Sequence, residues 1–151
     1  MIYIASLMMK RTPLTLAIAD DHTLFRKGLI EILKAYDEIT LLCEAANGVE
    51  LLEKIEKNLP DIVMLDLEMP EMDGLATARY LFSKHPGVKI LVVSMYGEEQ
   101  LVEMLLSEGA HGYLLKSADP EEMRATLQTL KNASNNGNAY AHSSRSGGLP
   151  N

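Results

Sequence analysis

The sequence VMLDLEMPEMDG, residues 63–74, is the stretch that most directly indicates how this chain folds. Its first part is apolar and ends at Asp66, and its second part carries the turn-forming residues Pro70 and Gly74. A short apolar run bounded by turn residues is typical of a strand that is buried on both faces. Such a strand fixes Asp66 at the rim of a sheet, where we expect the following loop to leave it open to solvent. Taken alone, Asp66 fits an ordinary turn residue as well as a reactive carboxylate.

The same succession of an apolar run and an amphipathic segment repeats on both sides of this stretch. The apolar runs are predicted strands, at residues 14–20, 39–46, 61–66, 88–94 and 111–116. The amphipathic segments are predicted helices, at residues 23–36, 49–58, 75–85, 98–109 and 119–132. Five strand–helix pairs predict an α/β fold with a doubly wound, five-stranded parallel sheet, (βα)5. We expect the flavodoxin-like strand order 2-1-3-4-5.

Local signals define two of the helix ends and one helix face. Gly109 is the expected C-cap of the helix at 98–109. Asp119 is the expected N-cap of the helix at 119–132, with proline directly after it. The periodicity of the helix at 23–36 predicts an apolar face made of Leu24, Phe25, Leu29, Ile32 and Leu33.

Composition and charge exclude several classes of protein. A net charge of −7 argues against a broad basic surface for nucleic acid. The chain has a single cysteine, so no internal disulfide framework forms, and no apolar run is long enough to cross a bilayer. We therefore expect a cytoplasmic protein that does not bind membranes. Its folded domain would span residues 14–132, after an N-terminal extension at 1–13 and before a linker or disordered tail at 133–151.

Polar residues end four of the predicted strands. Asp20 and Asp21 end the first strand, Asp66 the third, Ser94 the fourth and Lys116 the fifth. Ligands of such sheets bind beyond the carboxyl ends of the strands, so these side chains should meet at one rim. Two carboxylates about 4 Å apart repel each other by roughly 4 kcal/mol at an effective dielectric constant of 20. Converging aspartates must therefore shift their pKa values or share a cation, for which Mg²⁺ is suited.

Four segments with these residues resemble the receiver domain of two-component response regulators. They read IADDHTLFRKGL, VMLDLEMPEMDG, LVVSMYGEE and GYLLKSADPEEM, and the resemblance covers residues 14 to about 132. The sequences of the first and last segments are most similar to those of the NarL/FixJ group, whose members carry a LuxR-type helix-turn-helix output domain. The resemblance implies that Asp66 accepts a phosphoryl group, that Ser94 bonds a phosphoryl oxygen and that Lys116 pairs with its charge. It also implies that Tyr113 turns inward on activation, although Tyr113 fits a half-buried aromatic of an edge strand as well.

The resemblance also implies a metal site for Mg²⁺ or Mn²⁺. Its ligands would be Asp21, Asp66 and the backbone carbonyl of Glu68, with Asp20 acting through a bound water. The four histidines show no metal-ligand spacing, and we interpret them as surface or loop residues: His22, His85, His111 and His142. One departure from the family is Ser117, since many receivers have a proline after the lysine, joined by a cis bond.

The implied function is that of a signalling domain rather than an enzyme with a substrate of its own. A histidine kinase would phosphorylate Asp66, and residues from about 98 to 132 would change as a result. Homodimerisation on phosphorylation would follow, and DNA would be bound only through a C-terminal domain that is not in this chain. The alternative within the family is a stand-alone receiver that acts through protein partners.

Two other classes of protein share parts of this pattern. Phosphatases of the haloacid dehalogenase type use a strand-end aspartate, but they carry a second aspartate two residues later, where this chain has Glu68. An FMN carrier with the same fold would need a phosphate loop rich in glycine and hydroxyl groups after the first strand. Asp20 and Asp21 occupy that place, and carboxylates repel phosphate in the absence of a metal.

Overall fold

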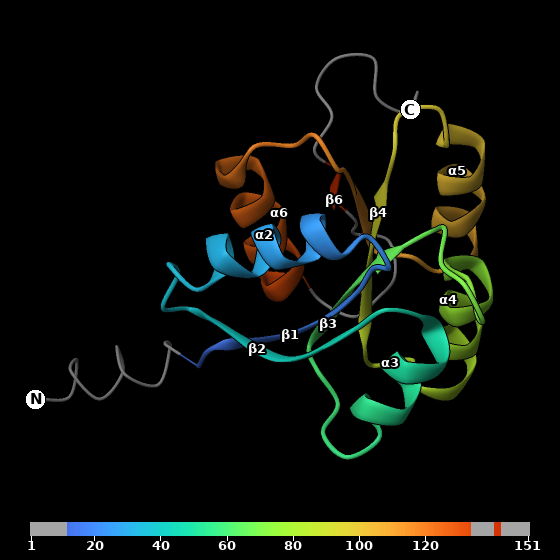
Figure 1. Ribbon diagram of the computed structural model, residues 1–151, viewed down its shortest axis with the longest axis horizontal. Coiled ribbons are helices and arrows are strands. Elements are labelled where there is room, and N and C mark those ends of the chain that lie inside the picture. The colour runs from blue at the N-terminus through green and yellow to red at the C-terminus, as the bar shows by residue number, and fades with distance from the viewer. Residues whose placement is uncertain (1–11, 134–140, 143–151) are drawn as a thin grey trace, which may run out of the picture.

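The structure, a computed structural model, describes residues 12–133 and 141–142 of the chain. A parallel sheet runs through its centre and carries helices on both faces (Figure 1). Its strands are β1 (Leu14–Ala19), β2 (Ile39–Ala45), β3 (Ile62–Asp66), β4 (Lys89–Ser94), β5 (Gly112–Leu115) and β6 (Ala141–His142). Its helices are α2 (Thr23–Leu33), α3 (Gly48–Ile55), α4 (Gly74–Lys84), α5 (Glu99–Glu108) and α6 (Pro120–Asn132).

The order of the strands confirms the predicted fold. Neighbouring strands pair in the order β2-β1-β3-β4-β5-β6, and every pair is parallel. Strands β3 and β4 are buried at each position because helices cover both of their faces, which explains their nearly uniform apolar sequences. Strand β2 is only partly buried, as expected for an edge. The doubly wound sheet and the predicted order of its first five strands are therefore correct.

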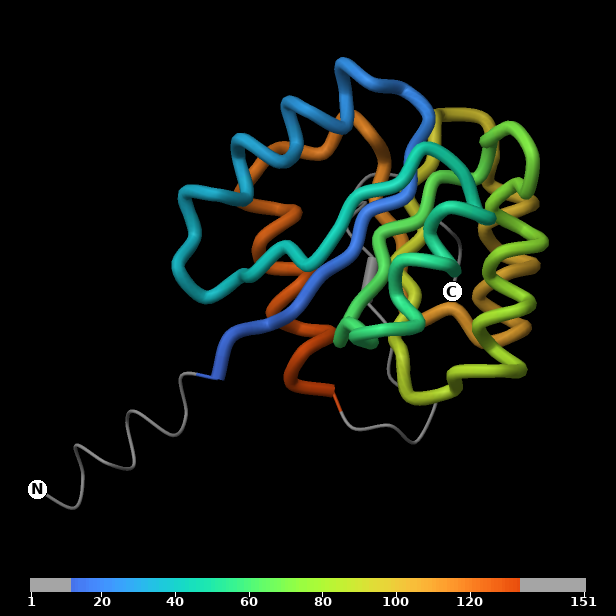
Figure 2. The backbone as a smooth tube through the Cα atoms, turned by 60° about the horizontal axis from the view of Figure 1, so that its bottom comes forward, coloured from blue at the N-terminus to red at the C-terminus, as the bar shows by residue number. Residues whose placement is uncertain are grey.

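Two hydrophobic cores fill the space between the sheet and the two helical layers. Helices α2 and α6 cover one face of the sheet, and α3, α4 and α5 cover the other (Figure 2). Successive residues of a strand point to opposite faces, so each strand contributes to both cores. Leu16 and Ile18 of β1 pack toward α2 and α6, for example, whereas Ala17 and Ala19 pack toward the other layer.

The buried face of α2 differs from the predicted one. Leu29, Ile30 and Leu33 are buried, but Leu24 is 81% exposed and Ile32 is 37% exposed. Helical periodicity predicts an apolar stripe along α2, but it does not predict which side of that stripe faces the sheet. The angle at which α2 crosses the sheet turns Leu24 and Ile32 outward. The inclusion of these two residues in the apolar face was therefore wrong.

The predicted helix caps are confirmed. The Asp119 side chain accepts a hydrogen bond from the backbone N–H of Glu122 at 2.8 Å, and Pro120 opens α6. Gly109 ends α5 with a φ of 143°, a conformation that favours glycine. Four of the five helices are shorter than predicted, by up to three residues in α2, which ends at Leu33 instead of at residue 36, and α4 has the predicted length but begins one residue earlier.

One short strand was not predicted. Ala141 and His142 form β6, which pairs with Gly112 and Tyr113 of β5, within the segment expected to be linker or disordered tail. The rest of that segment after residue 133, and residues 1–11 of the predicted extension, lie outside the described residues. In the described part of the chain, none of the helices combines the length and the apolar sequence that crossing a membrane requires.

Candidate functional site

The register of the sheet brings the predicted polar residues to one edge. Leu65 of β3 pairs with Ala19 of β1, so Asp66 lies level with Asp20, the residue after β1. Ser94 ends β4 beside Leu115 of β5, and its carbonyl accepts a hydrogen bond from the Lys116 backbone N–H at 2.8 Å. The predicted convergence at the carboxyl ends of the strands is thus present in the structure.

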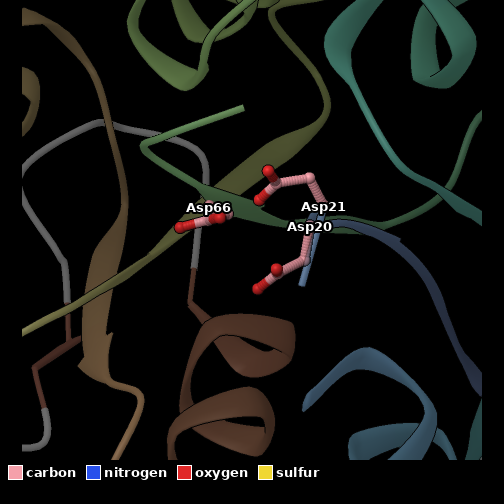
Figure 3. A group of neighbouring side chains, drawn as sticks. All are labelled: Asp20, Asp21 and Asp66. Carbon is pink, nitrogen blue, oxygen red and sulfur yellow. The ribbon is translucent and has the colours of Figure 1, made fainter. Parts of the chain in front are cut away.

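Three aspartates face a common space at this edge (Figure 3). One carboxylate oxygen from each of Asp20, Asp21 and Asp66 lies within 4.8 Å of the others. Asp20 and Asp66 are buried, at 2% and 5% exposure, and Asp21 is exposed. The Asp20 side chain also accepts a hydrogen bond from the His22 backbone N–H at 2.7 Å, which fixes its orientation at the start of α2.

Lys116 provides positive charge within this group. Its Nζ lies 2.9 Å from Oδ2 of Asp20 and 3.5 Å from Oδ2 of Asp66. The same ammonium group lies 4.8 Å from the centre of the Phe25 ring, in the geometry of a cation–π contact. Burial lowers the pKa of Lys116, but the two aspartates outweigh burial and raise it above its ordinary value. Lys116 therefore stays charged, and it bridges the two buried carboxylates.

Asp66 itself has an unusual acidity. Burial, followed by repulsion from the Asp20 carboxylate, raises the pKa of Asp66 from 3.8 to about 7, against the opposing effects of Lys116 and the Glu68 backbone N–H. One ammonium group shared with Asp20 does not compensate for both the lost hydration and the neighbouring charge. A shift of this size in a pocket marks Asp66 as a candidate for function.

The loop after Asp66 is held tightly against it. The Gly74 N–H donates to the Leu67 carbonyl at 3.0 Å, which closes the loop at the start of α4. A Cβ atom on Gly74 would lie 2.2 Å from the Asp66 carbonyl oxygen, so only glycine allows this approach. Asp73 caps α4 by accepting from the Ala76 N–H at 2.9 Å. The turn residues of VMLDLEMPEMDG therefore position Asp66 through backbone contacts.

A pocket of about 630 Å³ opens above the aspartates. It is lined by Asp21, His22, Asp66, Glu68, Met69, Pro70, Met95, Glu98 and Lys116. Asp66 was expected to be open to solvent, but its side chain is almost fully buried at the floor of this pocket. Leu67 and Met69, which follow the strand, are buried as well. Access to Asp66 is through the pocket.

The other predicted site residues lie at or behind this pocket. Ser94 is buried at the end of β4, while Glu68 is exposed on the pocket wall. Tyr113 is buried in the core between the sheet and the layer of α3, α4 and α5, rather than half-buried at an edge. The peptide bond between Lys116 and Ser117 is trans, unlike the cis bond of many receivers.

The prediction that the histidines are surface or loop residues is confirmed for His22, which is exposed before α2, and for His85 and His111, which lie between elements. His85 follows the end of α4, where it is partly buried. His111 is also partly buried, and its Nδ1 accepts a hydrogen bond from the Ile90 N–H at 3.1 Å. The side chain of His142 lies outside the described residues.

Sequence reasoning missed two contacts of the site. It assigned Phe25 only to the apolar face of a helix, although Phe25 also contacts Lys116. It did not single out Glu98, which lines the pocket and accepts a hydrogen bond from the Met95 N–H at 2.7 Å. Both contacts join residues from different elements or across a loop, and no local sequence pattern marked either one.

The donor atoms fit a small divalent cation. Oδ2 of Asp20 is buried and forms the ion pair with Lys116, but no hydrogen-bond donor in the described part of the chain reaches it in good geometry. With Asp21 and Asp66 it offers hard oxygen ligands, and the pocket leaves room for the waters that Mg²⁺ retains. A cation here would also relieve the repulsion among the three aspartates.

Comparisons with known proteins agree with this geometry. Residues 16–128 match the response regulator receiver domain. The transcriptional regulatory protein YhcZ of Bacillus subtilis is 41% identical over 113 residues, which are 75% of this chain and 53% of YhcZ. The nitrate/nitrite response regulator NarL of Escherichia coli is 38% identical over 120 residues, 80% of this chain and 56% of NarL.

A solved structure supports the same relation. A DNA-binding response regulator of the LuxR family from Staphylococcus aureus superposes with a TM-score of 0.74 at 28% identity. The match covers 79% of this chain and 99% of that one. The chain spans about half the length of the curated relatives it matches.

Proposed function

Because the chain belongs to the response regulator receiver family, of the NarL and LuxR type, we propose that it accepts a phosphoryl group on Asp66 from a histidine kinase. The observation that carries this proposal is the position of Asp66. It lies at the floor of an open pocket, beside a second buried aspartate at the end of neighbouring β1, and Lys116 after β5 bridges the two carboxylates. Asp66 acts as the nucleophile, and the charge of Lys116 together with that of a bound metal ion would favour its ionised form, so the transfer needs no general base.

The reaction needs little chemistry from the protein. A carboxylate oxygen of Asp66 bonds to phosphorus while the phosphorus–nitrogen bond of the phosphohistidine breaks. The electron pair of that bond goes to the imidazole, which takes up a proton as it leaves. Lys116, 3.5 Å from Asp66, offsets charge on the transferred oxygens. Ser94, at the end of the adjacent strand, donates its hydroxyl to one of these oxygens.

Mg²⁺ or Mn²⁺ is the proposed cofactor of the site. Asp21, Asp66 and the backbone carbonyl of Glu68 would hold it directly, and Asp20 through a water. When bound, it supplies a positive charge that neutralises the phosphoryl oxygens. The cluster of Asp20, Asp21 and Asp66 supports this assignment.

The output of the domain is proposed to follow from a movement of Ser94. Its hydroxyl turns toward the phosphoryl group, Tyr113 fills the space behind it, and the surface of α5, β5 and α6 changes. We propose that this surface then mediates dimerisation and controls transcription through a DNA-binding domain beyond this chain, in the cytoplasm. A stand-alone receiver acting through protein partners is the alternative, and the downstream reading frame of the gene distinguishes the two.

The test is the uptake of one phosphoryl group. The chain is incubated with Mg²⁺ and acetyl phosphate and its mass is measured, with Asp66→Asn and Asp61→Asn as variants. Asp61 precedes the same strand at its opposite end, so it is a matched control. We expect uptake by the wild type and Asp61→Asn and none by Asp66→Asn. No uptake by the wild type, or uptake that persists in Asp66→Asn, would refute the proposal.

A further inference from the structure

The connection from β4 to α5 contains a contact that the proposed transfer does not use. The Glu98 side chain accepts a hydrogen bond from the Met95 backbone N–H at 2.7 Å. Met95 follows Ser94 directly, so this N–H is the first one beyond the end of β4. Both Met95 and Glu98 line the same pocket as Asp66. The carboxylate of Glu98 therefore engages a backbone donor at the wall of the phosphoryl-acceptor pocket.

The direction of the Glu98 side chain is informative. Glu98 occupies the N-cap position of α5, where a side chain ordinarily accepts from an N–H of the first helical turn, but it makes no such bond. Its carboxylate instead reaches back across the turn at Gly97, whose φ is 101°. Glu98 thus leaves the start of α5 without a side-chain cap and satisfies a donor of the loop.

The charges around the pocket make this contact sensitive to a second anion. In the described part of the chain, the pocket is lined by one lysine or arginine, Lys116, and by four residues with carboxylates: Asp21, Asp66, Glu68 and Glu98. A phosphoryl group on Asp66 brings further negative charge and strong acceptor oxygens. Two anions that approach one N–H compete for it and repel each other, and a carboxylate on a flexible side chain is the one that can move away.

We propose that Glu98 is a positioning residue that restrains phosphorylation, because its carboxylate occupies the Met95 N–H and repels anions until a phosphoryl group on Asp66 displaces it. This inference rests on the proposed function and deepens it. The Met95 N–H becomes a donor to the phosphoryl group only when Glu98 has moved away. The residue therefore sets how readily the site accepts and retains an anion, without contacting Asp66.

The test compares Glu98→Ala and Glu98→Gln with Glu99→Ala in the whole chain. Glu99 is a matched control, because its loss changes the net charge equally while its carboxylate accepts from the Gly97 N–H and does not line the pocket around Asp66. Two readouts are measured with Mg²⁺ present: the rate of phosphorylation against acetyl phosphate concentration, and the affinity for beryllofluoride as a mimic of the phosphoryl group. Thermal unfolding reports any loss of structure.

We expect Glu98→Ala to bind beryllofluoride about 3–10-fold more tightly than the wild type. Its phosphorylation should be favoured by a similar factor, mainly through a lower half-saturating concentration of acetyl phosphate. Glu98→Gln, which keeps an acceptor but loses the charge, should lie between the two, and Glu99→Ala should match the wild type. If the wild type takes up a phosphoryl group but Glu98→Ala behaves like Glu99→Ala, the proposed role of Glu98 is refuted and the proposed function is not. A wild type that takes up none refutes the proposed function instead.

Discussion

The Asp66 carboxylate is held in a position that costs the folded protein free energy. It is buried beside Asp20, and the nearest ammonium group, that of Lys116, lies closer to Asp20 than to Asp66. An ordinary core residue at this position would avoid both the desolvation and the repulsion. The same features keep the carboxylate poorly compensated and accessible from a pocket, which suits a nucleophile that must gain a charged group.

This cost predicts that Asp66→Asn is more stable than the wild type at alkaline pH. The pKa of Asp66 is 3.8 when unfolded and about 7 when folded. Between these values the folded state binds more protons than the unfolded state, so the free energy of unfolding of the wild type falls as pH rises. Asparagine does not titrate, so the free energy of unfolding of Asp66→Asn does not fall with pH for this reason.

We expect the variant to exceed the wild type by roughly 2–4 kcal/mol at pH 8, with the difference disappearing near pH 4. Urea unfolding from pH 4 to 8 without divalent cations measures it. Addition of Mg²⁺ should stabilise the wild type more than the variant. Equal free energies of unfolding at pH 8 would contradict the cost assigned to Asp66.

At the scale of elements, the site depends on how closely α4 approaches the end of β3. Gly74, the first residue of α4, packs its backbone against the carbonyl of Asp66 and the Cα atom of Leu67. Gly28 in α2 has the opposite environment, since a Cβ atom there would meet nothing within 4 Å. The two glycines therefore form a matched pair, one required by packing and one not.

Substitution of these glycines by alanine should have effects of opposite sign. Gly74→Ala forces β3 and α4 apart and should lower the free energy of unfolding by about 1–3 kcal/mol, with slower phosphorylation because Asp66 shifts. Gly28→Ala should raise it by about 0.5–1 kcal/mol, because alanine favours the helix and the space is open. Chemical unfolding and phosphorylation by acetyl phosphate measure both. A neutral Gly74→Ala would show that the contact at Asp66 is not tight.

The elements also show how far the sequence could predict the site. The strand ends were predictable, because β1, β3 and β4 are apolar runs and the polar residue at the end of each run lies at the same rim of the sheet. The outward turn of Leu24 was not, since periodicity defines a stripe but not the angle at which a helix crosses the sheet. The contact of Glu98 with Met95 depends on the path of a single loop, which propensity does not encode.

At the scale of the whole molecule, the two ends of the sheet serve different purposes. The carboxyl ends of the strands carry the pocket and its poorly compensated charges. At the opposite end the charged groups are well partnered: Asp61 accepts from the Thr15 N–H at 2.9 Å and lies 3.3 Å from Nζ of Lys131. Lys89, only 9% exposed at the start of β4, donates to the carbonyl oxygens of Leu130 and Ala133 at the end of α6. This end fastens α6 to the sheet.

Lys89 and Lys116, at opposite ends of the sheet, therefore separate stability from function. Lys89→Met removes two charge-assisted hydrogen bonds and leaves their carbonyl acceptors without them. It should lower the free energy of unfolding by about 1–3 kcal/mol and leave the rate of phosphorylation within about twofold of the wild type. Lys116→Met removes the charge-assisted contact that Lys116 makes with the transferred group, worth about 1.5–3 kcal/mol, so phosphorylation should slow by about 10–100-fold.

Both variants make the same chemical change at opposite ends of the sheet, so each is the control for the other. Urea unfolding and phosphorylation by acetyl phosphate are measured on both at one pH and one Mg²⁺ concentration. A Lys89→Met protein that loses phosphorylation as Lys116→Met does would contradict the division, because it would show that the attachment of α6 controls the pocket. If Lys89→Met has a lower free energy of unfolding but keeps the wild-type rate of phosphorylation, the charges around Asp66 act locally. The site then depends on the connection from β5 to α6, which contains Lys116, and not on how α6 is attached to the sheet.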